Sequence, residues 1–334
     1  MRRLVFITQQ VDPEHAALAN TVRKVAALAA GVDELVVLAD GVVPDAMPAG
    51  ARFRSFRSGV KIGRGLRFEA ALARELRPRP LAVVAHMCPI YAVLAAPLVR
   101  PLGIPLLLWF THWRPSRLLA LAERVSTSVI TVDRRSFPIA SEKVVPIGHG
   151  IDVDEFRCAS RAPADRLRVI ALGRTSPAKG FETIARAAAL AGVDLELRGP
   201  SSTKEERAER RRLQELGAQV EEPIPHAQIP ALLQAKDVLV NNMREGALDK
   251  VVYEAAATCM PVLASNSGFE DVLPPELRFR REDPEGLAEK LRWLTGADRA
   301  ALGRGLRARV EARHSVAHWA DEVLRVAETG AAKG

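Results

Sequence analysis

A short loop after an apolar run places two cations where a phosphate could bind. The run RVIALG (168–173) is typical of a buried strand, and Arg174 and Lys179 follow it before the helical pattern FETIARAAALAG. The first turn of a helix offers free N–H groups to an anion, and arginine adds a planar fork for two phosphate oxygens. Neither GxxxxGK[ST] nor GxGxxG is present, so P-loop and dinucleotide-binding turns are not indicated. The loop from Gly173 to Gly180 is therefore a candidate diphosphate site, although a solvated turn with two ordinary cations fits the same residues.

A second group of charged residues precedes the helical pattern KVVYEAAATC. Glu245 and Asp249 stand in the loop after the apolar run KDVLVNN, and Glu254 lies four residues beyond Lys250 on the same face of the predicted helix. A carboxylate in this position can accept hydrogen bonds from ribose hydroxyls. Two simpler interpretations fit as well: Asp249 as the N-cap of the helix, and Lys250 with Glu254 as a surface pair worth roughly a few tenths of a kcal/mol.

The elements that must hold these loops alternate regularly along the 334 residues. Short Val/Ile/Leu runs alternate with helical patterns in both halves, which is the βαβ rhythm of a parallel sheet. Runs at 3–8, 34–39, 81–86, 105–110 and 128–133 predict strands in the first half, with helices at 16–30 and 90–100. Runs at 168–173, 193–199, 236–242 and 260–265 predict strands in the second half, with helices at 181–192, 203–217, 250–259, 284–295 and 316–328.

A segment rich in Gly, Pro, Asp and Ser, at 146–165, divides the two halves. The predicted fold is α/β, with two Rossmann-like doubly wound domains that face a cleft. The domains cover residues 1–155 and 156–315. Ligands of such sheets bind at the carboxyl ends of the strands, where the charged loops described above fall.

Three stretches of the second half resemble the donor domain of glycosyltransferase family 4, the retaining enzymes of GT-B fold. They are VPIGHGIDVDEF, VIALGRTSPAKGFETIARAAAL and EGALDKVVYEAAATCMPVLASNSGFEDVL, in the order and spacing of the family. The resemblance implies a retaining transfer of a sugar from a nucleotide-diphosphate sugar to an unidentified acceptor, such as a glycolipid, a glycan or a small molecule. It also implies that the last helix, 316–330, packs back onto the first domain.

The resemblance assigns roles to residues of the donor domain. Arg174 and Lys179, with Gly173 in the same loop, would contact the donor diphosphate. Glu254 would be the second Glu of the family's E-x7-E motif and bind the nucleotide ribose. The place of the first Glu, which contacts the sugar, is taken here by Gly246, while Glu245 lies one residue further away. Backbone N–H groups of the segment from Gly246 to Lys250 could contact the sugar instead. Ala247, Leu248 and Lys250 are therefore also predicted to bind the donor.

The first half resembles the family less closely. The usual Gly-Gly loop after the first strand is replaced by a polar segment that contains Gln9, Gln10 and Asp12, which could meet acceptor or donor. Phe110-Thr111-His112-Trp113 follows a predicted strand and resembles the family's buried strand-end His, which approaches the transferred sugar. His112 is therefore the third predicted catalytic residue, beside Arg174 and Lys179.

The excess of positive charge lies wholly in the first half. Residues 1–150 hold 20 Lys+Arg and 11 Asp+Glu, a balance of +9, whereas residues 151–334 hold 28 and 29, a balance of −1. A basic half indicates an acidic partner. Residues 52–79 are rich in arginine and carry apolar side chains, which predicts contact with an anionic membrane surface, while a solvated loop is the simpler alternative. Aromatic residues are not interleaved as in a nucleic-acid module, so no nucleic acid is expected.

Cysteines and metal-ligand residues are too scattered to predict a covalent or metal framework. Cys88, Cys158 and Cys259 are far apart, and we expect three buried thiols in a reducing cytosol. Asp152-Val153-Asp154 spells the DxD motif of metal-dependent transferases but lies in a linker that the resembling family carries with no metal role. His86, His149 and His226 are not spaced as a ligand set. We expect neither metal nor cofactor, and a cytoplasmic protein, since the start has no secretory apolar core.

Two other functions stay open. A nucleotide-sugar epimerase on a related fold would need no acceptor. A catalytically inactive protein that binds nucleotide sugars would fit the altered spacing of the E-x7-E motif.

Overall fold

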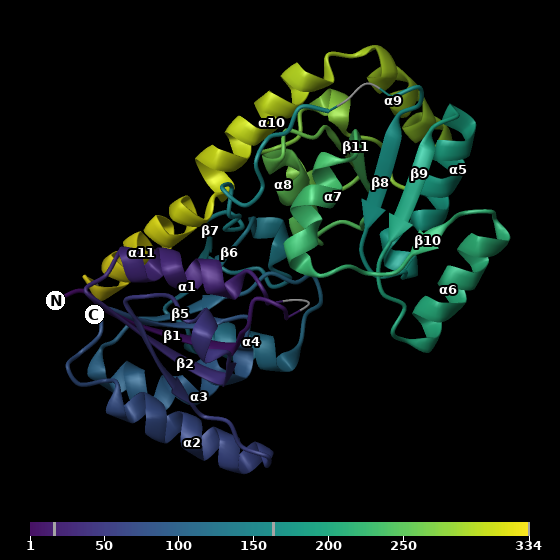
Figure 1. The fold of residues 1–334 in the computed structure, drawn as a ribbon. Coiled ribbons are helices and arrows are strands. Elements are labelled where there is room, and N and C mark those ends of the chain that lie inside the picture. Colours follow the sequence, from purple (N-terminus) through teal and green to yellow (C-terminus); the bar gives the residue numbers. More distant parts are fainter. Residues whose placement is uncertain (16–17, 162–163, 333–334) are drawn as a thin grey trace. The chain divides into compact units, whose positions relative to one another are not determined.

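The computed structural model describes residues 1–15, 18–161 and 164–332, and it divides into two compact units. Unit 1 comprises Met1–Asp152 together with the segment that begins at Arg313, and unit 2 comprises Val153–Ala312. Each unit is built on its own parallel sheet with helices on both faces (Figure 1). The sequence had placed the domain boundary three residues later, after residue 155.

Seven parallel strands form the sheet of unit 1, in the order β3-β2-β1-β4-β5-β6-β7. They are β1 Arg3–Val11, β2 Glu34–Val42, β3 Ala51–Ser55, β4 Ala82–His86, β5 Leu106–Trp109, β6 Ser128–Thr131 and β7 Val144–Pro146. The order reverses between β1 and β4, as in doubly wound sheets. Strands that are buried on both faces have near-continuous apolar sequences, which explains why five of them were predicted. The edge strands β3 and β7, one rich in arginine and the other ending at a proline, were not.

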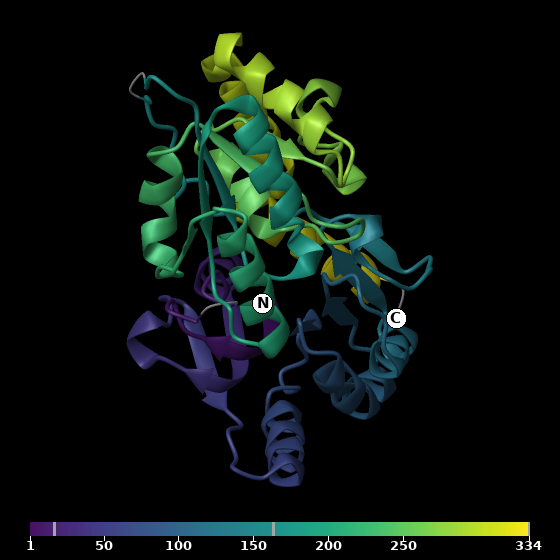
Figure 2. The same cartoon turned by 90° about the vertical axis from the view of Figure 1, so that its right-hand side faces the viewer.

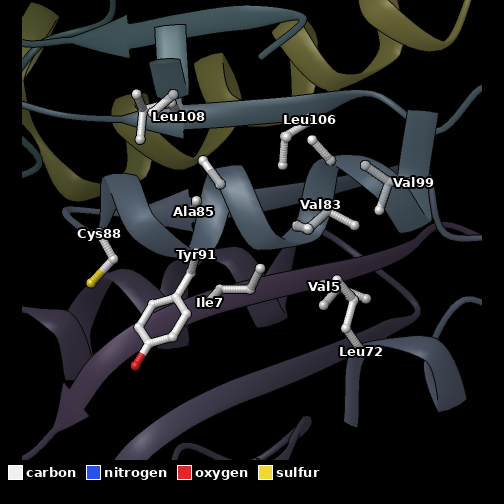
Figure 3. Packing of buried hydrophobic residues seen from close by; sticks show 14 of the residues in the cluster. Val5, Ile7, Leu72, Val83, Ala85, Cys88, Tyr91, Val99, Leu106 and Leu108 are labelled. Atoms are coloured by element: carbon white, nitrogen blue, oxygen red, sulfur yellow. The ribbon is translucent and has the colours of Figure 1, made fainter. Parts of the chain in front are cut away.

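The α-helices among the described residues of this unit are α1 Thr21–Ala30, α2 Lys61–Arg74, α3 Pro89–Val99, α4 Arg117–Val125 and α11 Val316–Ala331. The helix predicted for 16–30 begins at Thr21, and residues 16 and 17 of that prediction lie outside the described residues. Figure 3 shows the main core of the unit, where strand residues such as Val5, Val83 and Leu108 lie against α3. An aromatic group of Phe56, Phe68 and Tyr91, with ring centroids 4.8–5.4 Å apart, extends this core toward α2.

The last helix, α11, packs against α1 within unit 1 (Figure 1). Its Trp319 meets Trp109 of β5 edge-to-face, with 5.5 Å between the ring centroids. The ammonium group of Lys24 from α1 lies 4.2 Å and 4.6 Å from the centroids of these two rings, a cation–π arrangement at a buried position. Side chains from both ends of the chain therefore complete one core.

Unit 2 has five parallel strands in the order β10-β9-β8-β11-β12. They are β8 Arg168–Leu172, β9 Asp194–Arg198, β10 Val220–Glu221, β11 Val238–Asn241 and β12 Val262–Ala264. The helices are α5 Phe181–Ala191, α6 Lys204–Glu215, α7 Ile229–Gln234, α8 Lys250–Ala257, α9 Pro284–Gly296 and α10 Arg299–His314. Figure 1 shows α5 and α9 on one side of the sheet and α7 and α8 on the other, and in Figure 2 α5 and α6 face the viewer.

A disulfide joins Cys158 to Cys259 within unit 2, with the two Cα atoms 4.9 Å apart. The prediction of three buried thiols is therefore wrong. Cys158 is exposed, and the segment that contains it lies along the carboxyl end of α8, where Arg161 donates hydrogen bonds to the carbonyls of Thr258 and Cys259. Spacing along the chain could not reveal this approach. Cys88 is a buried thiol as predicted, and burial raises its pKa to about 12.

Candidate functional site

The charged loops singled out in the sequence leave one edge of the unit 2 sheet. β8, β11 and β12 are neighbours and run parallel, so the segments that follow them, at 173–180, 242–249 and 265–268, start from the same edge. Unpaired backbone groups and loop side chains gather at such an edge, which is the usual ligand position in open α/β sheets. The donor-domain residues of the sequence prediction lie in these loops or in the helix that follows.

Glycines at both ends of the 173–180 loop allow its close contacts. Gly173 has φ +139°, and a Cβ there would stand 2.6 Å from Nζ of Lys179, whose side chain folds back over it. Gly180 has φ +58°, and a Cβ there would collide with the Nδ2 atom of Asn242. That Nδ2 donates to the carbonyl of Gly180 at 3.1 Å. These contacts tie the amino end of α5 to the end of β11.

Lys179 is held by a carboxylate from the neighbouring loop. Its Nζ lies 2.5 Å from Oδ2 of Asp249, and the buried Asn241 donates from Nδ2 to the same oxygen at 2.7 Å. The lysine side chain is 13% exposed and the aspartate 21%. Asp249 does occupy the N-cap position of α8, but its side chain makes no capping hydrogen bond. The capping role is therefore wrong, because Lys179 and Asn241 engage the carboxylate instead.

The side chain of Arg174 points to solvent, unlike that of Lys179. Its side chain is 70% exposed, and Nε lies 3.9 Å from Oε1 of Glu206 on α6. The next residue, Thr175, is fully buried and anchors the loop through hydrogen bonds to Ser201 and to the carbonyl of Glu206. No described contact joins Arg174 to Lys179, so the binding of one ligand by both residues stays a prediction.

Glu254 is buried and carries two nitrogen partners. Nζ of Lys250 lies 2.8 Å and Nε2 of His226 lies 3.0 Å from its Oε1. Burial alone would raise the pKa of Glu254, but Lys250 and His226 more than offset it and lower that pKa to about 2. The carboxylate is therefore ionised at neutral pH. The surface-pair interpretation of Lys250 and Glu254 is wrong, since only about 5% of the glutamate side chain is exposed.

His226 is a site residue that sequence reasoning missed. It lies just before α7, and its Nε2 is also 2.8 Å from Nζ of Lys250. One ring nitrogen can donate to Glu254 or accept from Lys250, but it cannot do both at once. From the sequence, His226 was weighed only as a possible metal ligand. Its contact with Glu254 joins a loop and a helix 28 residues apart, and no sequence pattern predicts such a contact.

Glu245 is exposed and turned toward the loop after β12. Its two carboxylate oxygens accept from the backbone N and the Oγ of Ser267, each at 2.9 Å. Gly246 follows with φ +79°, and Ala247 and Leu248 are buried beneath the loop. In this structure Glu245 thus joins two loops to each other. Its predicted contact with the sugar stays a prediction.

The residues predicted in unit 1 occupy more ordinary positions. Gln9 and Gln10 belong to strand β1 rather than to the loop expected after it. Asp12 accepts a hydrogen bond from the backbone N of Glu14 at 2.8 Å, as in a turn. His112 is exposed and stacks on Trp113, with ring centroids 5.7 Å apart.

The expected burial of His112 is wrong: it lies beyond the end of β5, after Phe110 and Thr111, and is exposed. The buried strand-end histidine is His86, the last residue of β4. Burial, with a smaller contribution from Lys24, holds the pKa of His86 well below its usual value. Its Nδ1 lies 3.4 Å from Oγ1 of Thr8. The proposed roles of His112, Gln9, Gln10 and Asp12 stay predictions.

Neither the DxD motif nor a cavity of unit 2 suggests another centre. Asp152 pairs with Arg23 at 3.1 Å. Across the residues that the structure describes, no three His, Cys, Asp or Glu side chains form a group that could hold a metal. A cavity of about 400 Å³ in unit 2 lies along β9, between Asp194 and Arg198. Arg168, Glu196 and Lys236 are among its lining residues, and they already make ion pairs.

Comparison with known proteins gives one family match and several solved structures of similar fold. Residues 174–325 match a family described as glycosyl transferase-like. Sucrose-phosphate synthase from Thermosynechococcus elongatus superposes with a TM-score of 0.78 at 19% identity, with all of both chains covered. Anabaena HepE in complex with UDP-glucose gives 0.76 at 16% identity, covering 98% of this chain and 100% of the other. The lipopolysaccharide outer core galactosyltransferase WaaB gives 0.71 at 12% identity, with 98% and 99% covered.

Curated proteins give no match to the sequence. At these identities the solved structures establish the fold, which is the two-domain GT-B fold with two Rossmann-like domains. The predicted fold class is confirmed. The family match agrees with the resemblance to group 1 glycosyltransferases, while membership of family 4 stays a prediction.

Proposed function

We propose that this chain is a glycosyltransferase that takes a sugar from a nucleoside diphosphate donor and transfers it with retention of configuration. One observation carries the proposal. The loops after β8 and β11, with the helices they lead into, bring together an ammonium group, a helix amino end and a buried ionised carboxylate at one edge of a single sheet. The first two suit a diphosphate and the third suits a ribose. The family match at 174–325 supports the same class of reaction.

The diphosphate would bind at Lys179 and the first turn of α5. The N–H groups of that turn are not used inside the helix, and the helix dipole favours an anion there. Arg174 has a long, exposed side chain that can turn from Glu206 toward a phosphate. Positive charge on these two side chains would do the work that a divalent cation does in other transferases, so we propose a metal-independent reaction.

The ribose would bind at Glu254. Both described contacts of its carboxylate use Oε1, which leaves Oε2 to accept hydroxyl groups. A carboxylate with a pKa near 2 stays an acceptor throughout the neutral range. Lys250 and His226 restrict its rotation, so the hydroxyl groups would meet a fixed oxygen.

Transfer would break the bond between the anomeric carbon and the diphosphate oxygen and form a bond from that carbon to the acceptor oxygen. The acceptor proton would pass to the leaving phosphate, so no protein nucleophile is required. Negative charge grows on the diphosphate as the first bond breaks. A preorganised cation at Lys179 would stabilise this charge more strongly in the transition state than in the bound donor.

A donor screen tests this proposal. Thermal unfolding is followed with UDP-, GDP- and ADP-sugars, where a ligand at 100 times its dissociation constant stabilises the protein by about 2.7 kcal/mol. We expect one base to stabilise and its sugar to be transferred in the presence of excess EDTA. An epimerised sugar formed without acceptor would favour the epimerase. Binding without any turnover would favour the inactive binding protein, and magnesium-dependent transfer would contradict metal independence.

We also propose that residues 52–79 of unit 1 contact an anionic membrane surface. Exposed apolar side chains gather at the start of α2: Val60, Ile62 and Leu66 are 66%, 77% and 64% exposed. Figure 1 shows α2 on the outside of the unit, and no described helix is long and apolar enough to span a bilayer.

The positive charge of this surface is smaller than the sequence suggested. Arg52, Arg54 and Arg64 form ion pairs with Glu34, Glu75 and Asp40. Six cations of the stretch have no described carboxylate within ion-pair distance; they are Arg57, Lys61, Arg67, Arg74, Arg77 and Arg79. Each can add roughly 1 kcal/mol near an anionic surface, while the exposed apolar side chains would enter the headgroup region.

A further inference from the structure

The ammonium group assigned to the donor diphosphate already has an anionic partner inside the protein. Asp249 lies 2.5 Å from Nζ of Lys179, and both side chains are mostly shielded from water. Asn241, at the end of β11, holds the same carboxylate oxygen, so the pair is fixed from the sheet side. A phosphate that binds Lys179 must share this ammonium with Asp249 or displace it.

We propose that Asp249 is a positioning residue that competes with phosphate for Lys179 and thereby discriminates against the nucleoside diphosphate product. The inference rests on the proposed function, since it takes Lys179 as the phosphate-binding group. Asp249 keeps the lysine side chain folded over Gly173 and directed along the loop. It also places a negative charge beside the bound phosphate.

The sign of the effect follows from the charges of donor and product. In a nucleotide sugar the terminal phosphate is esterified, whereas the nucleoside diphosphate left after transfer carries close to one more negative charge at neutral pH. Repulsion from Asp249 therefore weakens the product more than the donor. Partly buried charges a few ångströms apart interact much more strongly than they would in bulk water. The site would thus hold the donor and still release the product.

The neighbouring acid, Glu245, does not compete with phosphate for Lys179. Both of its oxygens are engaged by Ser267 on the next loop, and no described contact links it to Lys179. Asp249 is the acid that contacts the phosphate-binding cation. A motif scan that looks for a glutamate near Gly246 would overlook it.

The test compares product and donor affinities in Asp249→Asn. Asparagine keeps the shape and an oxygen that can accept from Nδ2 of Asn241, so the fold should be retained. Isothermal titration with the nucleoside diphosphate of the accepted base should give binding on the order of tenfold tighter than the wild type. The gain for the nucleotide sugar should be several-fold smaller. Asp283→Asn makes the same change at the N-cap of α9 and should alter neither affinity.

Two more variants keep the test decisive. Asp249→Ser removes the charge with a smaller polar side chain and carries the same expectation if the asparagine variant does not fold. In Lys179→Met the gain from Asp249→Asn should be smaller, because the competition for the ammonium group is lost and only the direct repulsion between Asp249 and the phosphate remains.

Unchanged or weaker product binding in folded Asp249→Asn would overturn the inference and leave the proposed function standing. A wild-type protein that binds no nucleotide would overturn both. A gain that persists undiminished in the Lys179→Met background would also overturn it.

Discussion

Replacing Glu254 with glutamine should destabilise unit 2 in a way that depends on pH. The carboxylate is buried and bonded to Lys250 and His226, and its pKa falls from the ordinary 4.5 to about 2. A shift of this size corresponds to roughly 3 kcal/mol of folding free energy. Glutamine preserves the volume and an acceptor oxygen but removes the charge. We therefore expect Glu254→Gln to lose about 3 kcal/mol at pH 7.

The pH dependence follows from the direction of the shift. A carboxyl whose pKa is lowered by folding contributes its full stability above pH 4.5 and loses it as the pH falls toward 2. About 60% of the contribution should be lost by pH 3. The stability difference between wild type and Glu254→Gln should therefore shrink from about 3 kcal/mol at pH 7 to about 1 kcal/mol at pH 3.

Urea unfolding at both pH values measures this difference, and hydrogen exchange of the α8 amides assigns it to unit 2. Glu311→Gln is a suitable control, because Glu311 is 46% exposed and pairs with Arg307 of the same helix, α10, and such surface pairs contribute roughly 0–1 kcal/mol. An equal difference at pH 7 and pH 3 would show that shape, rather than charge, makes Glu254 important, and it would refute the reasoning.

Three further outcomes are expected. Lys179→Ala and Arg174→Ala, checked for folding by circular dichroism, should each lower turnover at saturating donor about 100- to 1,000-fold, and near-normal rates in both would place the active site elsewhere. Wild-type protein should float with anionic vesicles, and less so at high salt. The double variant Ile62→Ser with Leu66→Ser should abolish this binding, whereas the same change at the exposed leucines of α4 should not. Equal binding to neutral vesicles would contradict the membrane proposal. Cys158→Ser should lower the stability of unit 2 by about 2–5 kcal/mol and make its melting insensitive to reductant, whereas a wild type that melts identically with and without reductant would argue against the disulfide.

Elements with a strong apolar pattern could be predicted, and elements defined by their partners could not. Buried strands such as β1 and β8 have continuous Val/Ile/Leu runs that favour a parallel sheet. β3 was missed because its arginines make ion pairs that only the folded chain brings together. The two-residue strand β10 and the short helix α7 are too brief for periodicity, and the long helix α10 is too polar for a clear apolar face.

In the candidate site, too, some residues could be predicted from the sequence and their partners could not. Residue types and spacing predicted the loop that carries Lys179 and the helix that carries Glu254, because glycines and charges after a buried strand are a local signal. The partners of those residues, Asp249 and His226, depend on which loops meet at the sheet edge. Burial of Glu254 and exposure of His112 likewise follow from neighbours that are distant in sequence.

The placement of α11 in unit 1 also determines when that unit can fold. Unit 2 is a continuous segment, Val153–Ala312, inserted into a unit whose last helix comes from the end of the chain. During synthesis, every residue of unit 2 has left the ribosome before Trp319 can reach Trp109. Domains generally fold as units while the chain emerges, and contacts between distant segments form slowly. The inserted unit should therefore become resistant to protease first, and nascent chains that stop before α11 should keep the seven-stranded sheet exposed to chaperones.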